Sequence, residues 1–422
     1  MTVTLRAPAT PATTADGAIR QPNSSRTTPK GGFRDNNAGS NNQIVLVGCA
    51  RATSFNAYLL TSANGTTWSS ILAFALNNSG EYVQSAFQDS LGKVHVVTYS
   101  FADGPRYYRV ALNYTGGDIT SCTLEASFVF TIDDGVFTAD NRPDMCELVD
   151  GNGTRYIGLL NSCSRQANTG WRINLARFAR DITAANQITG INGTGTRTQL
   201  YSDLVVSGHE RLGAIVQFDD RTIGIFGGYC VGEIPGTGDF FAKAILPPDT
   251  NTTWTLNTFT DETTASANHG NVIVRGNTAY RCRMTNSDEL MRVDSITSTG
   301  TLTLNVFPTV TLDASTSVLE MSMSPDATKV YAACVSYNDN GVLAYYDGSS
   351  WTRQEWSLVN WGGNAACWPR GIAMIGVNDD TNVSIITVWD DTVDVVSTPV
   401  NPCVPILKSR RMRTQTYLPG RR

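Results

Sequence analysis

The stretch that decides the fold is SAFQDSLGKVHVVTYS, residues Ser85 to Ser100, in which two apolar runs flank a polar turn. Each run has the length of a strand, and the Asp, Ser and Gly between them favour a tight reversal, so the stretch predicts a β-hairpin. The same arrangement returns along the chain, which indicates a repeat architecture. The other copies are Cys146 to Ser162, Ala214 to Tyr229, Val272 to Met284, Met321 to Ser336 and Ala373 to Trp389.

The spacing of these hairpins identifies the repeating unit. Their second strands are anchored at Val94, Tyr156, Ile223, Ala279, Val330 and Val383, at intervals of 51 to 67 residues. A weaker strand around Val45 lies 49 residues before Val94 and adds a seventh unit. Intervals of this size fit a four-stranded blade whose two inner strands form the hairpin. The sequence therefore predicts an all-β fold, a β-propeller of seven blades, with six blades as the alternative.

Turns that end in Trp follow some of the hairpins and predict outer strands. They are Thr61 to Trp68, Pro247 to Trp254 and Tyr345 to Trp351. The first resembles the Asp-box turn of sialidase-like propellers, Ser/Thr-x-Asp-x-Gly-x-Thr-Trp, with Ala63 in place of the Asp. The matching positions are Thr61, Gly65, Thr67 and Trp68. In that family the turn stabilises the fold away from the active site, so the resemblance supports the propeller and implies no chemistry.

Composition agrees with an all-β chain, because charged residues make up only 16% and Thr, Ser, Asn and Gly supply much of the polarity. One segment, residues 172–188, has the spacing of a short helix and can equally be an insertion between blades. The nine cysteines include no Cys-x-x-Cys pair, so we expect free thiols and neither a metal nor another cofactor. No apolar run reaches the roughly 18 residues of a membrane span, and the N-terminus lacks a signal-peptide core. We therefore expect no membrane insertion.

The two ends differ from the body of the chain. Residues 1–42 are rich in Pro, Thr, Ala and Asn, with Phe33 as the single aromatic residue, and predict an extended arm. Residues 408–422 predict a basic tail, and 43–407 form the propeller. The arm carries a formal charge of +3 and the tail +6, which leaves about −14 for the body of a chain whose net charge is −5. Basic ends on an acidic body favour contacts with sister subunits or packaged DNA, and solvated ends are the alternative. The expected contact residues are Phe33, Arg34, Lys408, Arg410, Arg411, Arg413, Arg421 and Arg422.

Few residues suggest catalysis, and no nucleotide-binding or metalloprotease motif is present. His95 lies inside a predicted strand, where a satisfied structural histidine is the expectation. Hydrolysis of a glycosidic bond needs two suitably spaced carboxylates, and Asp144 and Glu147 are the first candidates. The segment Asn141 to Leu160 resembles the first-blade motif of some five-bladed glycosidases, although Asp144 follows Pro143 where that family has Asp before Pro. Further candidate carboxylates, and arginines of the kind sialidases use, are Glu210, Glu320, Arg142, Arg211 and Arg370.

Two functional hypotheses follow. The low charge, the free cysteines, the arm and the basic tail resemble propeller proteins of bacteriophage virions, which implies a multimeric structural component of the tail, in the nozzle, hub or a fibre. Its partners would be sister subunits and other virion proteins, and it would have no enzymatic activity. The alternative is a propeller that binds or cleaves a glycan, such as one on the host surface. In that case Trp361 and Trp368 would stack on the sugar, and Asp144 and Glu147 would lie in the funnel.

Overall fold

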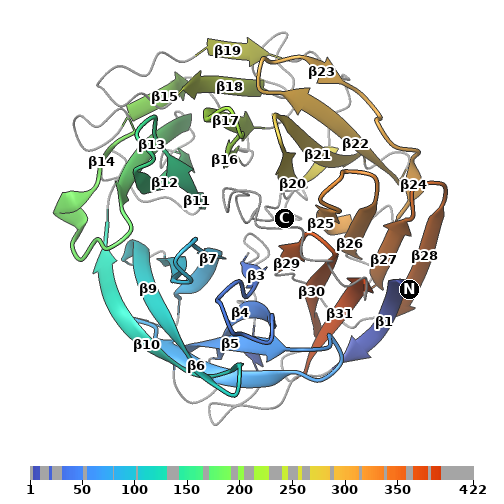
Figure 1. The fold of residues 1–422 in the computed structure, drawn as a ribbon, viewed down its shortest axis with the longest axis horizontal. Helices are drawn as coiled ribbons and strands as arrows, with labels where there is room; N and C mark the ends of the chain where they lie inside the picture. Colours follow the sequence, from blue (N-terminus) through green and yellow to red (C-terminus); the bar gives the residue numbers. More distant parts are fainter. Residues whose placement is uncertain are drawn as a thin grey trace, which may run out of the picture.

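The fold is a ring of β-sheets arranged around a central axis (Figure 1). It comes from a computed structural model. The residues described are 3–9, 19–20, 31–50, 55–78, 80–100, 103–130, 142–164, 171–191, 198–203, 213–227, 240–245, 255–258, 267–285, 289–312, 316–336, 340–357, 365–378 and 382–390. Over these residues the strands form seven separate antiparallel sheets, each with four or five strands. The chain is therefore a β-propeller, and the seven sheets are its blades.

The blades follow one another in chain order, and in each blade the first strand lies at the centre of the ring. The last blade is the exception to chain order, because its outermost strand comes from the N-terminus. Blade 1 contains β3 (Gly32–Arg34), β4 (Ile44–Ala50), β5 (Asn56–Ser62) and β6 (Ser69–Ala75), with β2 (Ile19–Arg20) also paired to β4. Blade 2 contains β7 (Tyr82–Gln88), β8 (Val94–Ser100), β9 (Gly104–Thr115) and β10 (Asp118–Val129). Blade 3 contains β11 (Arg142–Val149), β12 (Arg155–Ser164), β13 (Trp171–Ala179), β14 (Thr189–Gly190) and β15 (Thr198–Asp203).

The remaining four blades complete the ring. Blade 4 contains β16 (Gly213–Gln217), β17 (Thr222–Gly227), β18 (Phe240–Ile245) and β19 (Thr255–Thr258). Blade 5 contains β20 (Ala267–Arg275), β21 (Thr278–Thr285), β22 (Leu290–Thr297), β23 (Leu302–Thr303) and β24 (Val310–Thr311). Blade 6 contains β25 (Thr316–Met323), β26 (Val330–Ser336), β27 (Asn340–Tyr346) and β28 (Trp351–Ser357). Blade 7 contains β29 (Ala365–Trp368), β30 (Gly371–Asn378), β31 (Asn382–Asp390) and β1 (Val3–Ala9).

The predicted hairpins form the two inner strands in five blades, and the weak strand around Val45 is the second strand of blade 1. Blade 7 differs from the expectation. Its innermost strand is β29, only four residues long, so the hairpin with Val383 supplies the second and third strands. The fourth strand is β1, from the other end of the chain.

The N-terminal segment departs from the predicted arm wherever the structure describes it. Strand β1 pairs with β31 along the outer edge of blade 7, with Leu5 opposite Val388. Strand β3 is the innermost strand of blade 1, with Phe33 opposite Val45. Blade 7 is thus built from both ends of the described chain, and this pairing closes the ring. The predicted basic tail, residues 408–422, lies outside the described residues.

The segment with helical spacing also forms a strand. Residues Trp171–Ala179 are β13, and the only helical turn in the described parts of the chain is the 3₁₀ helix η1 (Ala185–Gln187). Leu175 packs with Leu148 and Ile215 towards blade 4, whereas Phe178 packs with Phe87 towards blade 2. Both faces of β13 are buried between blades, so apolar residues lie on both sides of this strand. Their spacing therefore does not indicate a helix.

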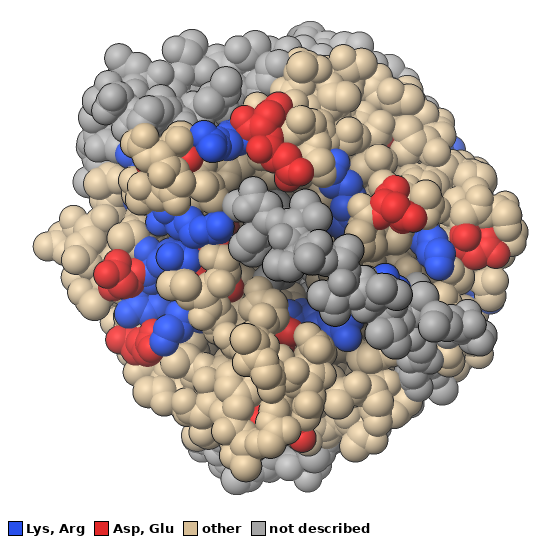
Figure 2. Space-filling view, viewed as in Figure 1, with Lys and Arg blue, Asp and Glu red and all other residues tan. Residues whose placement is uncertain are grey.

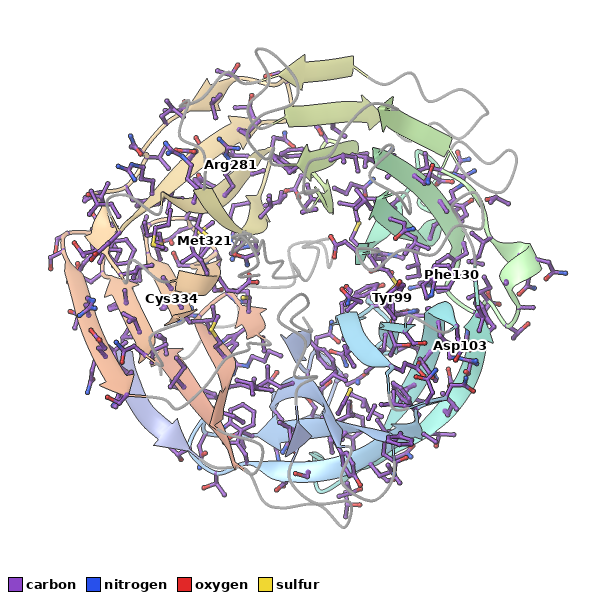
Figure 3. The ribbon with its side chains drawn as sticks, turned by 180° about the vertical axis from the view of Figure 1, so that it is seen from behind. Tyr99, Asp103, Phe130, Arg281, Met321 and Cys334 are labelled. Carbon is purple, nitrogen blue, oxygen red and sulfur yellow. The ribbon has the colours of Figure 1, made fainter. Side chains whose placement is uncertain are left out.

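Hydrophobic side chains fill the spaces between neighbouring sheets, as Figure 3 shows. The described cysteines are free, as predicted, and comprise Cys49, Cys122, Cys146, Cys282, Cys334 and Cys367. Burial raises the pKa of Cys122 to about 11. Within the described ranges, no helix has the length and apolar character needed to span a membrane.

The Trp-ended turns use a different residue from the one the Asp-box resemblance implied. In the first turn, the side-chain oxygen of Asn64 accepts hydrogen bonds from the backbone N–H groups of Thr66 and Thr67, both at 2.9 Å. In the third turn, Asp347 accepts the N–H groups of Ser349 and Ser350 at 2.7 and 2.8 Å. The acceptor therefore lies four residues before the Trp in both copies, one position later than in the Asp box. The second copy, Pro247 to Trp254, lies outside the described residues.

Candidate functional site

Asp144, the first candidate carboxylate, lies on the innermost strand β11 and is 3% exposed. Its Oδ2 accepts the backbone N–H of Ile215 in blade 4 at 3.1 Å. Its Oδ1 accepts the hydroxyl of Ser85 in blade 2 at 3.4 Å. Asp144 thus connects the innermost strands of three successive blades.

Glu147, the second candidate, is also engaged between blades. Its carboxylate accepts the backbone N–H and the hydroxyl of Ser90, at 3.1 and 2.8 Å. It also pairs with Arg155 at 3.3 Å and with Arg180 at 3.0 Å. Ser90 belongs to the β7–β8 turn of blade 2, so Glu147 fastens blade 3 to its predecessor.

The two carboxylates point away from each other. Alternate residues of a strand face opposite sides of its sheet, and positions 144 and 147 differ by an odd number. The neighbouring side chains agree, because Cys146 packs towards blade 4 and Met145 towards blade 2. Asp144 and Glu147 therefore do not converge on a shared space. Their roles as glycan ligands stay predictions.

These contacts belong to a series of polar ties between innermost strands, which we call the inter-blade belt. Asn271 of β20 binds Met321 of β25 twice: its Oδ1 accepts the Met321 N–H at 2.8 Å, and its Nδ2 donates to the Met321 carbonyl at 2.6 Å. Figure 3 labels Met321 beside the centre of the ring. Gln217 binds the N–H and carbonyl of Val149 in the same way, at 2.7 and 2.8 Å. In each case a side-chain amide makes the two backbone hydrogen bonds that a neighbouring strand would otherwise make.

Arg275, at the end of β20, also links blade 5 to blade 6, as Asn271 does. Its guanidinium donates to the carbonyl of Ser324 at 2.9 Å and to that of Met323. Burial lowers the pKa of Arg275 to about 10, and because this value is still above neutral pH the guanidinium remains charged. The Ser322 hydroxyl continues the belt by donating to the carbonyl of Trp368 in blade 7.

One of the two aromatic candidates, Trp368, is placed differently from the expectation. Trp368 is 4% exposed and packs with Ile44 and Leu46 of blade 1, and its ring centroid lies 5.8 Å from that of Trp389. A side chain buried in this way offers no face for stacking on a sugar. Trp361 lies outside the described residues.

The predicted partner contacts at the N-terminus are part of the ring. Phe33 is fully buried in the core between blades 1 and 2, which leaves it no surface for another subunit. Arg34 is partly buried, donates to the carbonyl of Asn42 at 3.1 Å and lies 5.8 Å from the ring centre of Trp389. It therefore contributes to the contact between blades 1 and 7. The predicted contacts at 408–422 are outside the described residues.

His95 is a satisfied strand residue, as expected. It is fully buried, with Nε2 3.1 Å from Asp89 and Nδ1 2.7 Å from the Tyr107 hydroxyl. Burial opposes the charge on Asp89, but the hydrogen bonds from His95 and the turn backbone outweigh it and lower the pKa of Asp89. Asp89 also accepts the N–H groups of Leu91 and Lys93, so the three buried side chains brace the β7–β8 turn.

Sequence reasoning did not identify a Tyr–Glu pair, and the structure contains one. The Tyr108 hydroxyl donates to Glu81 at 2.6 Å. Burial and the nearby Glu81 carboxylate raise the pKa of Tyr108. Tyr108 is 2% exposed and stacks on Phe74 of blade 1 with ring centroids 4.0 Å apart, so the pair is buried between blades 1 and 2, out of reach of a sugar. Because β9 pairs with β8 rather than with β7, no local motif joins the two residues.

The other candidates that the structure describes lie on three different elements. Glu320 is buried on β25. Arg370 lies in the turn between β29 and β30, Arg142 begins β11, and Glu210 and Arg211 fall outside the described residues. Among the residues that the structure describes, no group of three His, Cys, Asp or Glu side chains is placed to hold a metal ion.

No known family model matches the sequence, and no curated protein matches it either. Among solved structures, the chain is similar to the BP39L lectin from Burkholderia pseudomallei, with 10% identity, a TM-score of 0.53 and coverage of 86% of this chain and 96% of the lectin. It is also similar to the six-bladed fungal lectin of Aleuria aurantia, with 12% identity, a TM-score of 0.45 and coverage of 72% of this chain and 92% of the lectin. A third neighbour is the α-L-arabinanase of Penicillium chrysogenum, with 9% identity, a TM-score of 0.48 and the same two coverages as the Aleuria lectin. At these identities the likeness concerns the fold, and it agrees with the propeller described above.

Proposed function

We propose that this propeller binds a glycan and does not cleave it. The observation that carries the proposal is the placement of Asp144 and Glu147. These are the carboxylates expected to perform hydrolysis, yet each holds a neighbouring blade, and they lie on opposite faces of β11. Glycoside hydrolysis needs two carboxyl groups that flank one bond, at a separation of about 5 to 10 Å. Binding needs no such pair.

Two further points support a glycan as the ligand. The fold of the chain is similar to that of a protein described as a lectin, BP39L. The chain also has few charged residues, 16% of the total, and its Thr, Ser and Asn residues supply neutral donors and acceptors. Neutral hydroxyl and amide groups are suited to hydrogen bonding with sugar hydroxyls.

The virion hypothesis loses one of its supports. It drew on a free N-terminal arm, whereas β1 and β3 belong to blades 7 and 1. Glycan binding therefore takes precedence over assembly as the proposal to test.

The test is a glycan array with the full chain, followed by product analysis on every glycan that binds. The proposal predicts saturable binding to a subset of glycans, with each bound glycan recovered intact. Heat-unfolded chain serves as the control and should bind none of that subset. Absence of binding across the array, or release of shortened sugars, would contradict the proposal.

A further inference from the structure

Two arginines share one carboxylate at the boundary between blades 2 and 3. Glu147 on β11 pairs with Arg155 at the start of β12 and with Arg180 just after β13. The two arginine side chains remain 20% and 23% exposed, whereas the carboxylate is 13% exposed. One negative charge therefore faces two positive charges at a partly open position.

The register makes this arrangement unusual. Tyr156 pairs with Ala179, so Arg155 and Arg180 are opposite each other one step further along the two strands. Like charges directly opposite each other destabilise a sheet. Sequences that break a local rule of this kind do so most often at functional sites. The placement of two guanidinium groups on one carboxylate is thus a feature that an anionic ligand would explain.

Arg109 supports this surface from below. It is buried, donates to the carbonyls of Arg180 and Ile182 at 3.0 and 2.8 Å, and pairs with Glu125 at 3.0 Å. Lys93, which is 36% exposed, binds the same Glu125 and extends the surface. We call the three basic residues that reach the surface, Lys93, Arg155 and Arg180, the basic cluster.

This surface is less acidic than the chain as a whole. Against its three basic residues stand Glu125, Glu147 and the exposed Asp181, so the formal charges balance, whereas the chain as a whole carries −5. Figure 2 shows Lys and Arg side chains gathered on the left of this face, where Figure 1 draws blades 2 and 3. Leu91, in the adjoining turn, is 63% exposed and adds an apolar surface.

We propose that the basic cluster binds an anionic group, a carboxylate or sulfate, on an acidic glycan. The inference rests on the proposed function and names its ligand class. Arg180 binds Glu147 and Ser90 through Nη1, and a guanidinium carries five N–H donors, so donors remain for a second anion. Guanidinium groups recognise planar carboxylates in a bidentate way, and Glu147 holds both arginines in position for this.

The experiment is a calorimetric titration with two oligosaccharides of equal length, an oligogalacturonate and a neutral galactan. It uses the full chain, Arg180→Gln and, as a matched control, Arg353→Gln. Arg353 lies on β28 of blade 6, is 34% exposed and also pairs with a glutamate, Glu355. Arg180→Lys adds a variant that keeps the charge and loses the guanidinium fork.

We expect the oligogalacturonate to bind more tightly than the galactan, and its affinity to fall about tenfold in Arg180→Gln, the size of one lost charge-assisted hydrogen bond. Affinity should also fall as salt rises, and Arg353→Gln should match the unaltered chain. If both sugars bind equally, or Arg180→Gln changes nothing, the basic cluster is not the site while glycan binding stands. If neither sugar nor any arrayed glycan binds, the proposed function fails as well. Tight binding of an oligonucleotide in place of the oligogalacturonate would also overturn the inference.

Discussion

Replacing Asn271 with Ala tests whether side chains hold the blades together. Asn271 is fully buried, and a bulge in β20 between His269 and Val272 leaves it outside the regular pairing of the strand. Its amide satisfies both the N–H and the carbonyl of Met321. In Asn271→Ala both groups stay buried without these partners, at a cost of about 1–3 kcal/mol each. We therefore expect a loss of about 4 kcal/mol from a total stability of about 5–15 kcal/mol.

The assay is denaturant unfolding followed by tryptophan fluorescence, with thermal unfolding as a second measure. Asn36→Ala is the matched control, because Asn36 is exposed and only its backbone N–H makes a described hydrogen bond. It should stay within about 0.5 kcal/mol of the unaltered chain. A stability of Asn271→Ala within the same margin would refute the view that the inter-blade belt stabilises the ring.

Three other predictions address the closure of the ring and its turns. Deleting residues 1–9 removes β1 and bares the edge of β31, so light scattering should show aggregation and the melting temperature should fall; a stable monomer that melts as before would contradict the pairing. Because hydrogen bonds hold the pKa of Asp89 below its ordinary value, its stabilisation is present above about pH 4 and disappears as the pH falls through the folded-state pKa. Asp89→Asn should therefore flatten the dependence of unfolding free energy on pH below about pH 4, and an unchanged slope would count against this role. Gly92 and Gly153 occupy equivalent turns with φ of 80° and 82°, but a Cβ at Gly92 would lie 1.7 Å from the Asn37 side chain, whereas Gly153 faces open space. Gly92→Ala should thus lower the melting temperature clearly more than Gly153→Ala, and equal effects would argue against the close contact.

The sequence predicted the blades well, because each hairpin carries its own evidence. Two apolar runs and a turn of Asp and Gly are local features, and in blade 2 they correspond to β7, β8 and the turn that Asp89 braces. Strands that depend on distant partners were missed. β3 is only three residues long with one apolar side chain, and β1 pairs with residues 376 to 387 positions away. Nothing local distinguishes either from a solvated arm.

The candidate site was harder to predict for the same reason. Sequence analysis correctly placed Asp144 and Glu147 on an innermost strand, where a funnel carboxylate would lie. It could not show that Ile215 and Ser90, from the two neighbouring blades, approach these carboxylates. The basic cluster was equally hidden, because Arg155 and Arg180 become neighbours only through the register of β12 and β13. Contacts across blades depend on packing that no single repeat encodes.

The central claim is that the innermost carboxylates hold the ring together and perform no chemistry. The most direct test is Asp144→Asn, assayed together for unfolding free energy, glycan binding and sugar release. Asn keeps an oxygen that can accept the Ile215 N–H, so we expect a folded protein with glycan binding unchanged and stability lowered by about 1 kcal/mol. A variant as stable as the unaltered chain that has lost a measurable sugar-releasing activity would contradict the account.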